Sequence, residues 1–371
     1  MPARKHTQWL SKPTIEYVDS RIYSDWGIFH EEQEKIFKKC WIPLFHESEL
    51  ENHLDFRTSS IAGSKIAMIR DKERVVAFEH NFQSMPVSGN LESDGGYDHW
   101  NCPELPCEVK FGGMVWVTLN LEPPQDVEGW AAGAFDCIRP ALDTEPLEVF
   151  HYHKAIIDSN YKLWHDTNSE FYHDYMHYFN RVTGFNEEYF ARKCTGFENG
   201  HVNVGSFEVQ YGEFELGESR EELSFPHLPP NQWYMIDLFP GMNFNLRGSA
   251  LRTDVVTPLG PNKVMIEFRG FGLKKDTELE RKTRIEHHNT IWGPMGRNLH
   301  EDLLGITGQG ASMKPGQEHR HILHGRHEDE TIHDEIGMRH FYDEWSTWMG
   351  IDPKNPMREN AVWENREDAH V

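Results

Sequence analysis

The amino-acid sequence predicts an α+β fold, in which a small antiparallel β domain precedes a larger antiparallel sheet covered by helices. Short runs of β-forming residues, separated by Gly, Asp and Lys turns, fill residues 41–122. A second series of such runs lies between residues 201 and 273, and the helical patterns fall outside both series. Strands and helices therefore come in separate groups, which is typical of antiparallel sheets backed by helices.

The first third of the chain predicts a helix followed by strands. Residues 25–40 carry apolar side chains at helical spacing, and Ser24 or Asp25 can cap their start. Paired prolines in "LEPPQDVEGW" (Leu121–Trp130) cannot join a ladder, so this segment is the predicted domain boundary. The strands are expected within 55–71, 73–80 and 112–120. The expected divisions are an N-terminal helical segment at 1–40 that packs on the large domain, the small β domain at 41–122 and the large domain at 123–371.

The rest of the chain predicts a second sheet and two helical regions. The stretch "LEVFHYHKAIIDSNY" (147–161) is expected to form a strand pair, and a helix is expected from about Tyr161. Further strands are predicted within 201–216, 232–248, 251–260 and 263–273. Residues 277–294 predict a helix whose acidic start and basic continuation suit the helix dipole. The His-rich tail at 319–335 is expected to be a solvated helix and loop rather than a metal site.

The charge balance excludes several classes of partner. The chain has 371 residues, with 60 Asp and Glu against 37 Lys and Arg, for a net charge of −23. Such a surface repels phosphate backbones and anionic lipids, so neither nucleic acid nor a membrane is expected as a partner. No run approaches the roughly 20 apolar residues of a membrane span. The start resembles no signal peptide, and five scattered cysteines argue against a disulfide framework, so a cytoplasmic protein with free thiols is expected.

The segment "SEFYHDYMH" (Ser169–His177) carries the most informative pattern. At about 100° per residue, a helix would bring Asp166, Glu170, His173 and His177 within an arc of roughly 60°. Two histidines at positions i and i+4 can chelate zinc, iron or another divalent metal. Such pairs also arise by chance in a chain with 23 histidines, as surface or core residues. The carboxylates on the same face and the aromatic surroundings favour a metal site.

Two metal chemistries compete for this segment. "HDYMH" is similar to the zinc-protease pattern His-Glu-x-x-His, with Asp174 at the general-base position, although the shorter Asp would misplace the base. The alternative is a facial triad, in which two histidines and one carboxylate hold Fe(II) and leave positions open for dioxygen and substrate. A third ligand is then needed, and the turn and helix at Trp292–Gly305 offer Glu301 and Asp302.

From about Trp41 onward, the chain resembles the large (alpha) subunits of the Rieske non-haem iron oxygenases. The likeness rests on "NYKLWHDTNSEFYH", "GPMGRNLHED" and the strands at 242–273. The resemblance implies that His173, His177 and Asp302 bind Fe(II), and that Glu170 is the acid that links the iron to its electron donor. It also implies a catalytic domain of helix-grip type. Two departures concern this motif: three residues separate the histidines instead of the usual four, and Glu170 replaces an Asp.

A third departure concerns the electron source. A Rieske cluster needs Cys-x-His and Cys-x-x-His pairs, and neither is present, although the flanks of the small domain still resemble the family. The expectation is a degenerate Rieske-like domain without [2Fe–2S]. Electrons would come from a cluster on a partner subunit, served by a reductase or ferredoxin, in a trimeric or heterohexameric ring. An unrelated metal site would have to use His80, His99, Cys102 and Cys107, which are better explained as structural residues.

The resemblance leaves the reaction open among hydroxylation, dihydroxylation and oxidative dealkylation of a small, often aromatic, organic molecule. Arg247 and Arg252 are candidates for binding a carboxylate or sulfonate, or for surface ion pairs. A catalytically silent structural subunit and a zinc hydrolase are the alternative functions. The candidate substrate-binding residues are Phe239, Met242, Phe244 and Asn245.

Overall fold

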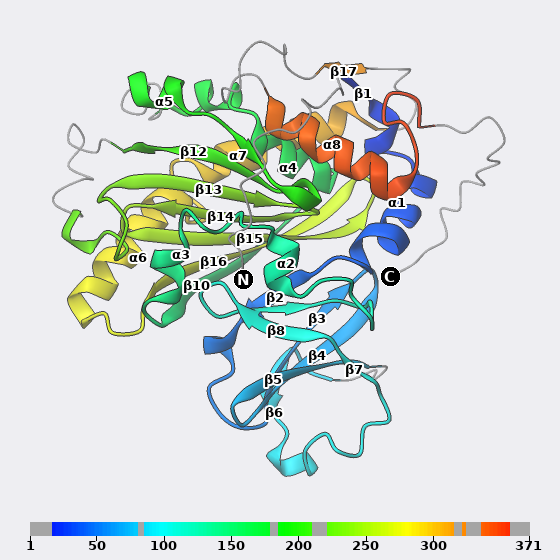
Figure 1. Cartoon of the computed structure of the whole chain (residues 1–371), viewed down its shortest axis with the longest axis vertical. Coiled ribbons are helices and arrows are strands. Elements are labelled where there is room, and N and C mark those ends of the chain that lie inside the picture. The colour runs from blue at the N-terminus through cyan, green and yellow to red at the C-terminus, as the bar shows by residue number, and fades with distance from the viewer. Residues whose placement is uncertain are drawn as a thin grey trace.

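The computed structural model describes residues 17–80, 85–178, 185–209, 221–314, 321–323 and 335–356. These residues form two lobes, a small one built on β2 to β9 and a large one built on a broad curved sheet (Figure 1). The α+β fold predicted from the sequence is confirmed.

The small lobe contains two antiparallel sheets. One has the order β2-β9-β8, and the other has the order β6-β3-β4-β5-β7. Along β4, Ile66 and Met68 pack into the main core of the molecule, whereas Ile69 faces a separate cluster with Phe56 and Phe78. Both faces of this strand are therefore buried, because successive side chains point to opposite sides. The strands are β2 (Ile42–His46), β3 (Asp55–Ile61), β4 (Ser64–Asp71), β5 (Arg74–Glu79), β6 (Ser88–Asn90), β7 (Glu104–Leu105), β8 (Cys107–Lys110) and β9 (Met114–Val117).

The large lobe is built on a seven-stranded antiparallel sheet with the order β10-β16-β15-β14-β13-β12-β11. The predicted strand pair at 147–161 is wrong: the segment forms one long strand that pairs with β16 from Leu147 to Ile157. No Gly, Pro, Asn or Asp interrupts this strand, so no turn breaks the ladder, and the only irregularity is a bulge between Val149 and His151. The strands are β10 (Leu147–Ile157), β11 (Thr195–Gly196), β12 (Val202–Glu208), β13 (Gln232–Leu238), β14 (Met242–Arg247), β15 (Ala250–Gly260) and β16 (Lys263–Leu273).

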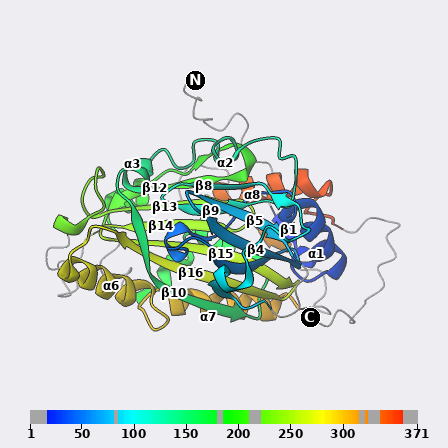
Figure 2. The ribbon, with the colours of Figure 1, turned by 90° about the horizontal axis from the view of Figure 1, so that it is seen from below.

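Helices lie on both faces of this sheet. Figure 2 shows the sheet between α2 and α3 on one side and α6 and α7 on the other. The helix predicted at 277–294 is confirmed as α6, which begins with a capping box between Thr277 and Glu280. The helices are α1 (Trp26–Glu32), α2 (Val127–Ala131), α3 (Arg139–Asp143), α4 (Tyr161–Ser169), α5 (Glu187–Ala191), α6 (Glu278–Trp292), α7 (Leu299–Ser312) and α8 (Ile336–Met349), with a π-helical turn at Gln33–Phe37 and 3-10 turns at Ser20–Tyr23, Glu47–Glu49, Glu92–Asp94, His173–Tyr175, Glu198–Gly200 and Glu221–Leu223.

Buried polar contacts fasten α1 to the large lobe. Nζ of Lys162 on α4 donates to Oε1 of Glu32 at 2.6 Å, and both side chains are almost wholly buried. Nε1 of Trp345 on α8 donates to the same oxygen at 2.7 Å. Burial lowers the pKa of Lys162 and raises that of Glu32, while their mutual attraction opposes both effects. This pair therefore ties three separate helices together.

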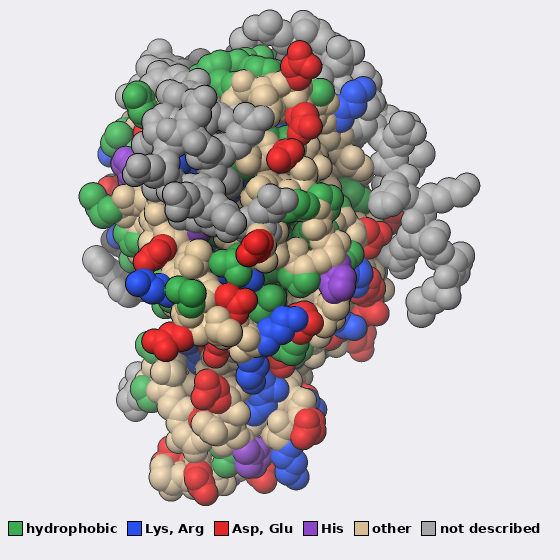
Figure 3. All heavy atoms as spheres, turned by 90° about the vertical axis from the view of Figure 1, so that its left-hand side faces the viewer, with side chains coloured by type: hydrophobic (Ala, Val, Ile, Leu, Met, Phe, Trp, Pro, Cys, Tyr) green, Lys and Arg blue, Asp and Glu red, His purple; other side chains and the backbone are tan. Residues whose placement is uncertain are grey.

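The surface and the tail complete the description. On the face shown in Figure 3, basic and acidic side chains are intermixed over the small lobe. No described helix is long and apolar enough to cross a membrane, and all five cysteines are free. Most of the tail at 319–335 lies outside the described residues, but His321–Leu323 forms β17, a strand paired with β1 (Tyr17–Asp19), instead of a helix.

Candidate metal centre

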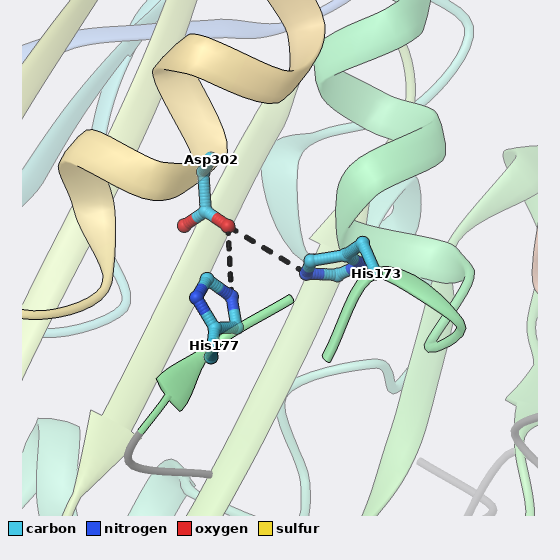
Figure 4. A group of neighbouring side chains, drawn as sticks. All are labelled: His173, His177 and Asp302. Carbon is cyan, nitrogen blue, oxygen red and sulfur yellow. Dashed lines mark ion pairs between the residues drawn. The ribbon is translucent and has the colours of Figure 1, made fainter. Parts of the chain in front are cut away.

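His173, His177 and Asp302 point toward one another (Figure 4). Nε2 of His177 lies 2.9 Å from Oδ1 of Asp302, and Nε2 of His173 lies 3.7 Å from the same oxygen. One potential ligand atom from each residue lies within 4.8 Å of the others, and within the described ranges this is the one group of three or more such residues. Two neutral nitrogens and one carboxylate oxygen form a donor set that suits Fe(II).

The histidines converge through a loop and not through a helix. The predicted helix from Tyr161 through His177 is wrong, because α4 ends at Ser169 and the backbone of Glu170 is extended, with φ −108° and ψ 151°. Oε2 of Glu170 accepts hydrogen bonds from the backbone N–H groups of Tyr172, at 2.7 Å, and His173, at 3.1 Å. These local bonds replace the intrahelical ones and start a 3-10 turn at His173.

Asp166 does not belong to this centre, although helical spacing placed it with the histidines. Its carboxylate accepts hydrogen bonds from the hydroxyls of Tyr342, at 3.0 Å, and Tyr23, at 3.1 Å. Because α4 ends at Ser169, the chain changes direction before His173. Asp166 therefore stays on the side of α4 that contacts Tyr23 and Tyr342, away from the two histidines. Burial raises the pKa of Asp166 to about 7.

Asp302 reaches the histidines from the first turn of α7. The chain turns sharply between α6 and α7, and a Cβ atom on Gly296 would lie 2.7 Å from the backbone of Ile291. Only glycine fits so close an approach. The turn thereby sets the start of α7 at Leu299, so that Asp302 projects over His177.

Each histidine has a second carboxylate on its other ring nitrogen. Nδ1 of His173 donates to Oε1 of Glu170 at 2.5 Å, and Nδ1 of His177 donates to Oε2 of Glu301 at 2.6 Å. Such partners fix the tautomer so that Nε2 is the free ligand atom. In the sequence, the only signal for this role of Glu301 is its position beside Asp302.

The pKa values of these side chains reflect the crowding of carboxylates around the two histidines. Burial disfavours the imidazolium of His173, but Glu170, Asp174 and Asp302 outweigh it and raise its pKa to about 10. The pKa of His177 is also raised against burial, chiefly by Asp302. Burial alone would raise the pKa of Asp302, yet the two histidines lower it. Protons on the two imidazoles thus balance the negative charge of the carboxylates, as a bound cation would.

Oδ1 of Asp302 supports the assignment of a metal centre. This oxygen is buried and faces Nε2 of His177 at 2.9 Å and Nε2 of His173 at 3.7 Å, and it makes no further contact with a hydrogen-bond donor among the described residues. A buried carboxylate oxygen without a partner is costly. A divalent ion between Asp302 and the histidines would satisfy it, so the residues present fit a mononuclear iron.

Asp174 also faces the centre, in contrast to its predicted place as a protease base. Its Oδ1 lies 3.7 Å from Nε2 of His173 and 3.9 Å from Nε2 of His177, and its Oδ2 accepts a hydrogen bond from Tyr189 at 2.7 Å. The zinc-protease pattern requires both histidines on one helix, and this segment is a 3-10 turn. The structure thus lacks the local geometry of that alternative.

A cavity of about 70 Å³ opens beside the ligands. Its floor is one face of the sheet, where Trp233 pairs with Arg247, Met235 with Asn245, and Asn245 with Arg252. Residues paired across strands share a face, which explains how three strands contribute to one cavity. The lining residues are Thr167, Asn168, Phe171, His173, Asp174, His177, Phe185, Tyr189, Arg192, Phe207, Trp233, Met235, Asn245, Arg247, Arg252, Trp292, Asn298 and Asp302.

Of the four predicted substrate-binding residues, only Asn245 lines this cavity. Met242 and Phe244 alternate with Asn245 on β14, so they point to the opposite face and join the main core. Phe244 packs edge-on against Phe135, with ring centroids 4.8 Å apart. Phe239 follows β13 and contacts Phe341 of α8 instead.

Three arginines line the cavity, and two of them, Arg247 and Arg252, are candidates from the sequence. The guanidinium of Arg252 is bound by Asp254, with Nη2 2.7 Å from Oδ2. Arg247 lies beside it on β14 and is 7% exposed, so the predicted surface ion pairs are wrong for both. The third, Arg192, follows α5 and has no signal in the local sequence.

The residues considered for a second metal site are spread over the small lobe. Cys102 packs beside the cluster of Phe56 and Phe78, whereas Cys107 belongs to the other sheet, on β8. Burial raises the pKa of Cys107 to about 12, which disfavours the thiolate that a metal needs. His99 is exposed.

Residues 144–351 match the sequence model of a family described as ring hydroxylating alpha subunit (catalytic domain). The chain is 57% identical to the methanesulfonate monooxygenase hydroxylase subunit alpha of Methylosulfonomonas methylovora, over 96% of this chain and 97% of that protein. It is 32% identical to the 2-aminobenzenesulfonate 2,3-dioxygenase subunit alpha of an Alcaligenes species, over 91% and 94% of the two chains. The first alignment spans 404 positions against 371 residues here, so at least 33 of its positions have no counterpart in this chain.

Solved structures share the fold. A quaternary ammonium Rieske monooxygenase matches with a TM-score of 0.71 and 17% identity, over 91% of this chain and 97% of that one. Naphthalene 1,2-dioxygenase from a Rhodococcus species, solved with indole bound, matches with a TM-score of 0.72 and 16% identity, over 90% and 94%. At these identities the likeness concerns the fold alone.

Proposed function

This chain belongs to the Rieske non-haem iron oxygenase alpha subunits, a family of oxidoreductases, and we propose that it is the mononuclear-iron subunit of an oxygenase that hydroxylates a small organosulfonate. The observation that carries the proposal is that one cavity is lined both by three potential metal ligands and by arginine side chains. His173, His177 and Asp302 converge at one end, and arginine side chains line the same space.

The metal-binding part of the proposal assigns Fe(II) to the three converging residues. Their Nε2 and carboxylate atoms supply three ligands on one side, and bound Fe(II) would supply the activation of dioxygen. Glu170 and Glu301 hold the imidazole rings by their Nδ1 atoms, which keeps each Nε2 directed at the metal position.

The substrate part rests on charge and size. Arginine forks bind planar or tetrahedral oxyanions through paired hydrogen bonds, and a cavity of about 70 Å³ suits a molecule of few atoms. Two relatives of this chain are named for sulfonate substrates, methanesulfonate and 2-aminobenzenesulfonate. Hydroxylation would convert one C–H bond to C–OH. The second oxygen atom of dioxygen leaves as water, and the reaction consumes two electrons and two protons.

The electrons must come from outside this chain, since its sequence holds neither Cys-x-His nor Cys-x-x-His. We assign the cluster to a partner subunit in a trimeric or heterohexameric ring, fed by a reductase or ferredoxin, and Glu170 to the contact with that cluster. Free cysteines and the absence of a spanning helix among the described residues support a cytoplasmic location.

The test is to copurify the protein from its source, load it anaerobically with Fe(II) and measure iron, acid-labile sulfide and oxygen uptake with methanesulfonate. We expect one iron and no acid-labile sulfide in this chain. Oxygen uptake should require a cluster-bearing partner, and sulfite should appear because an α-hydroxysulfonate dissociates to an aldehyde and sulfite. A cluster in the isolated chain, or sulfite formation without any Rieske protein, would contradict the proposal.

Two variants separate catalysis from a silent structural role. His173→Ala should abolish turnover of the complex, whereas an unchanged rate would favour the structural subunit. Glu170→Gln should bind Fe(II) more weakly, because His173 loses its charged partner. Once loaded with excess Fe(II), it should also slow electron transfer, measured as reoxidation of the partner's cluster. Glu286→Gln, on the exposed side of α6, is the matched control and should behave as the unmodified protein.

A further inference from the structure

Arg192 is a buried cation without a hydrogen-bonding partner for its terminal nitrogens. It directly follows α5 and is 4% exposed. Nε donates to the backbone carbonyl of Tyr189 at 3.2 Å. Nη1 and Nη2 are buried and make no hydrogen bond within the part of the chain that the structure describes. Four donor hydrogens are thus left unused on a group that stays charged in proteins.

Aromatic rings surround this guanidinium. Its Cζ atom lies between 4.4 and 4.8 Å from the centroids of four rings, which belong to Phe171, Tyr189, Phe207 and Trp233. Ring faces attract a cation but accept hydrogen bonds poorly. They also exclude water, which strengthens the attraction between Arg192 and an anion in the same space.

The other arginines of the cavity differ from Arg192 in having a partner for their charge. Nη2 of Arg252 donates to the carboxylate of Asp254, which balances the charge, although Nη1 of Arg252 makes no hydrogen bond among the described residues. Arg247 also has an interaction partner. Arg192 therefore combines burial, charge and open donors at one wall of the cavity. A buried cation in this state is costly unless an anion completes it.

Two intervening side chains link Arg192 to the metal ligand His173. Tyr189, whose ring stacks on the guanidinium, donates its hydroxyl to Oδ2 of Asp174 at 2.7 Å. Oδ1 of Asp174 lies 3.7 Å from Nε2 of His173. A small molecule held at Arg192 would therefore have its carbon end within the same cavity as the ligand atoms of the triad.

We propose that Arg192 binds the sulfonate group of the substrate, with Nη1 and Nη2 donating to two of its oxygens inside the aromatic enclosure. This inference rests on the proposed function and specifies which residue selects the anion. The third oxygen remains available to other donors of the cavity. Arg192 is thus a specificity-determining residue. Replacing it by an uncharged residue should leave the metal ligands unaffected.

The experiment uses Fe(II)-loaded protein under anaerobic conditions and measures binding of methanesulfonate by calorimetry. Dimethyl sulfone, which replaces one sulfonate oxygen by a methyl group and carries no charge, is the second probe. Arg192→Met should weaken methanesulfonate binding at least tenfold and change dimethyl sulfone binding less than twofold. Arg192→Lys, which keeps the charge but loses the fork, should fall between. Arg74→Met, at an exposed site of the small lobe, is the control.

Iron content and thermal unfolding distinguish this role from a structural one. Arg192→Met should retain its iron, and its unfolding temperature without ligand should not fall, because the change removes an unpaired buried charge. Unaltered methanesulfonate binding in Arg192→Met would overturn the inference while leaving the proposed function intact. Failure of the unmodified protein to bind any sulfonate would overturn both.

Discussion

Oε2 of Glu301 lies 2.6 Å from Nδ1 of His177, so the residue beside one metal ligand orients another. Both carboxylates come from the first turn of α7, and they contact opposite sides of the same imidazole. We predict that Glu301→Gln lowers the affinity for Fe(II) by about 10-fold to 100-fold, because the ring loses its charged partner. Anaerobic titration with Fe(II) measures this. Equal affinity in Glu301→Gln and the unmodified protein would show that Glu301 has no part in the site.

Removal of a proposed ligand should remove the metal. Asp302→Ala is expected to lower bound iron to less than about a tenth of the normal content, since three ligands are the minimum for a facial site. Elemental analysis after anaerobic loading and desalting gives the content. His99→Ala, a histidine exposed on the small lobe, should retain full iron. Loss of iron in His99→Ala together with retention in Asp302→Ala would locate the metal in the other lobe.

The buried ion pair between Lys162 and Glu32 predicts a large effect on stability. Lys162→Met leaves a buried carboxylate without its cation and should cost about 3–5 kcal/mol of the free energy of unfolding. The double variant Lys162→Met, Glu32→Gln should recover most of this loss, because a neutral amide still accepts from Trp345. Urea unfolding followed by fluorescence measures both.

The exposed pair of Lys38 and Glu34 provides the control for that measurement. Its side chains are 32% and 65% exposed, and Lys38→Met should cost less than about 1 kcal/mol. A similar loss in Lys162→Met and Lys38→Met would mean that burial adds nothing to the ion pair of α1 and α4.

Asp166 predicts how stability depends on pH. Burial raises its pKa from the usual 3.8 to about 7 in the folded protein, so the folded state holds a proton that the unfolded state has lost. Its favourable contribution is complete below pH 3.8 and disappears as the pH rises through about 7. Thermal unfolding between these values should therefore show a falling component that Asp166→Asn lacks. Asp136→Asn, at a half-exposed site, should keep it; the same pH profile in both variants would contradict the assignment.

Some features were predictable because they depend on local chemistry. The strand-rich segments, the helix α6 and the presence of metal-ligand side chains at His173, His177 and Asp302 all follow from short stretches of sequence. The boundaries at residues 40 and 122 and the roles assigned to the site residues stay predictions. Helical periodicity misplaced Asp166, because the side chain of Glu170 ended α4 by binding the backbone ahead of it.

The sequence by itself determined which chemistry the protein can carry: two histidines and acidic residues at close spacing, strands in two groups, and no pair of cluster ligands. Only the tertiary structure decided which face of β14 meets the cavity, that Glu301 and Asp174 approach the histidines, and that Arg192 is enclosed by four rings. The reason is physical. Residue type sets what a side chain can bind, whereas its neighbours come from distant segments, and packing of the whole chain brings these together.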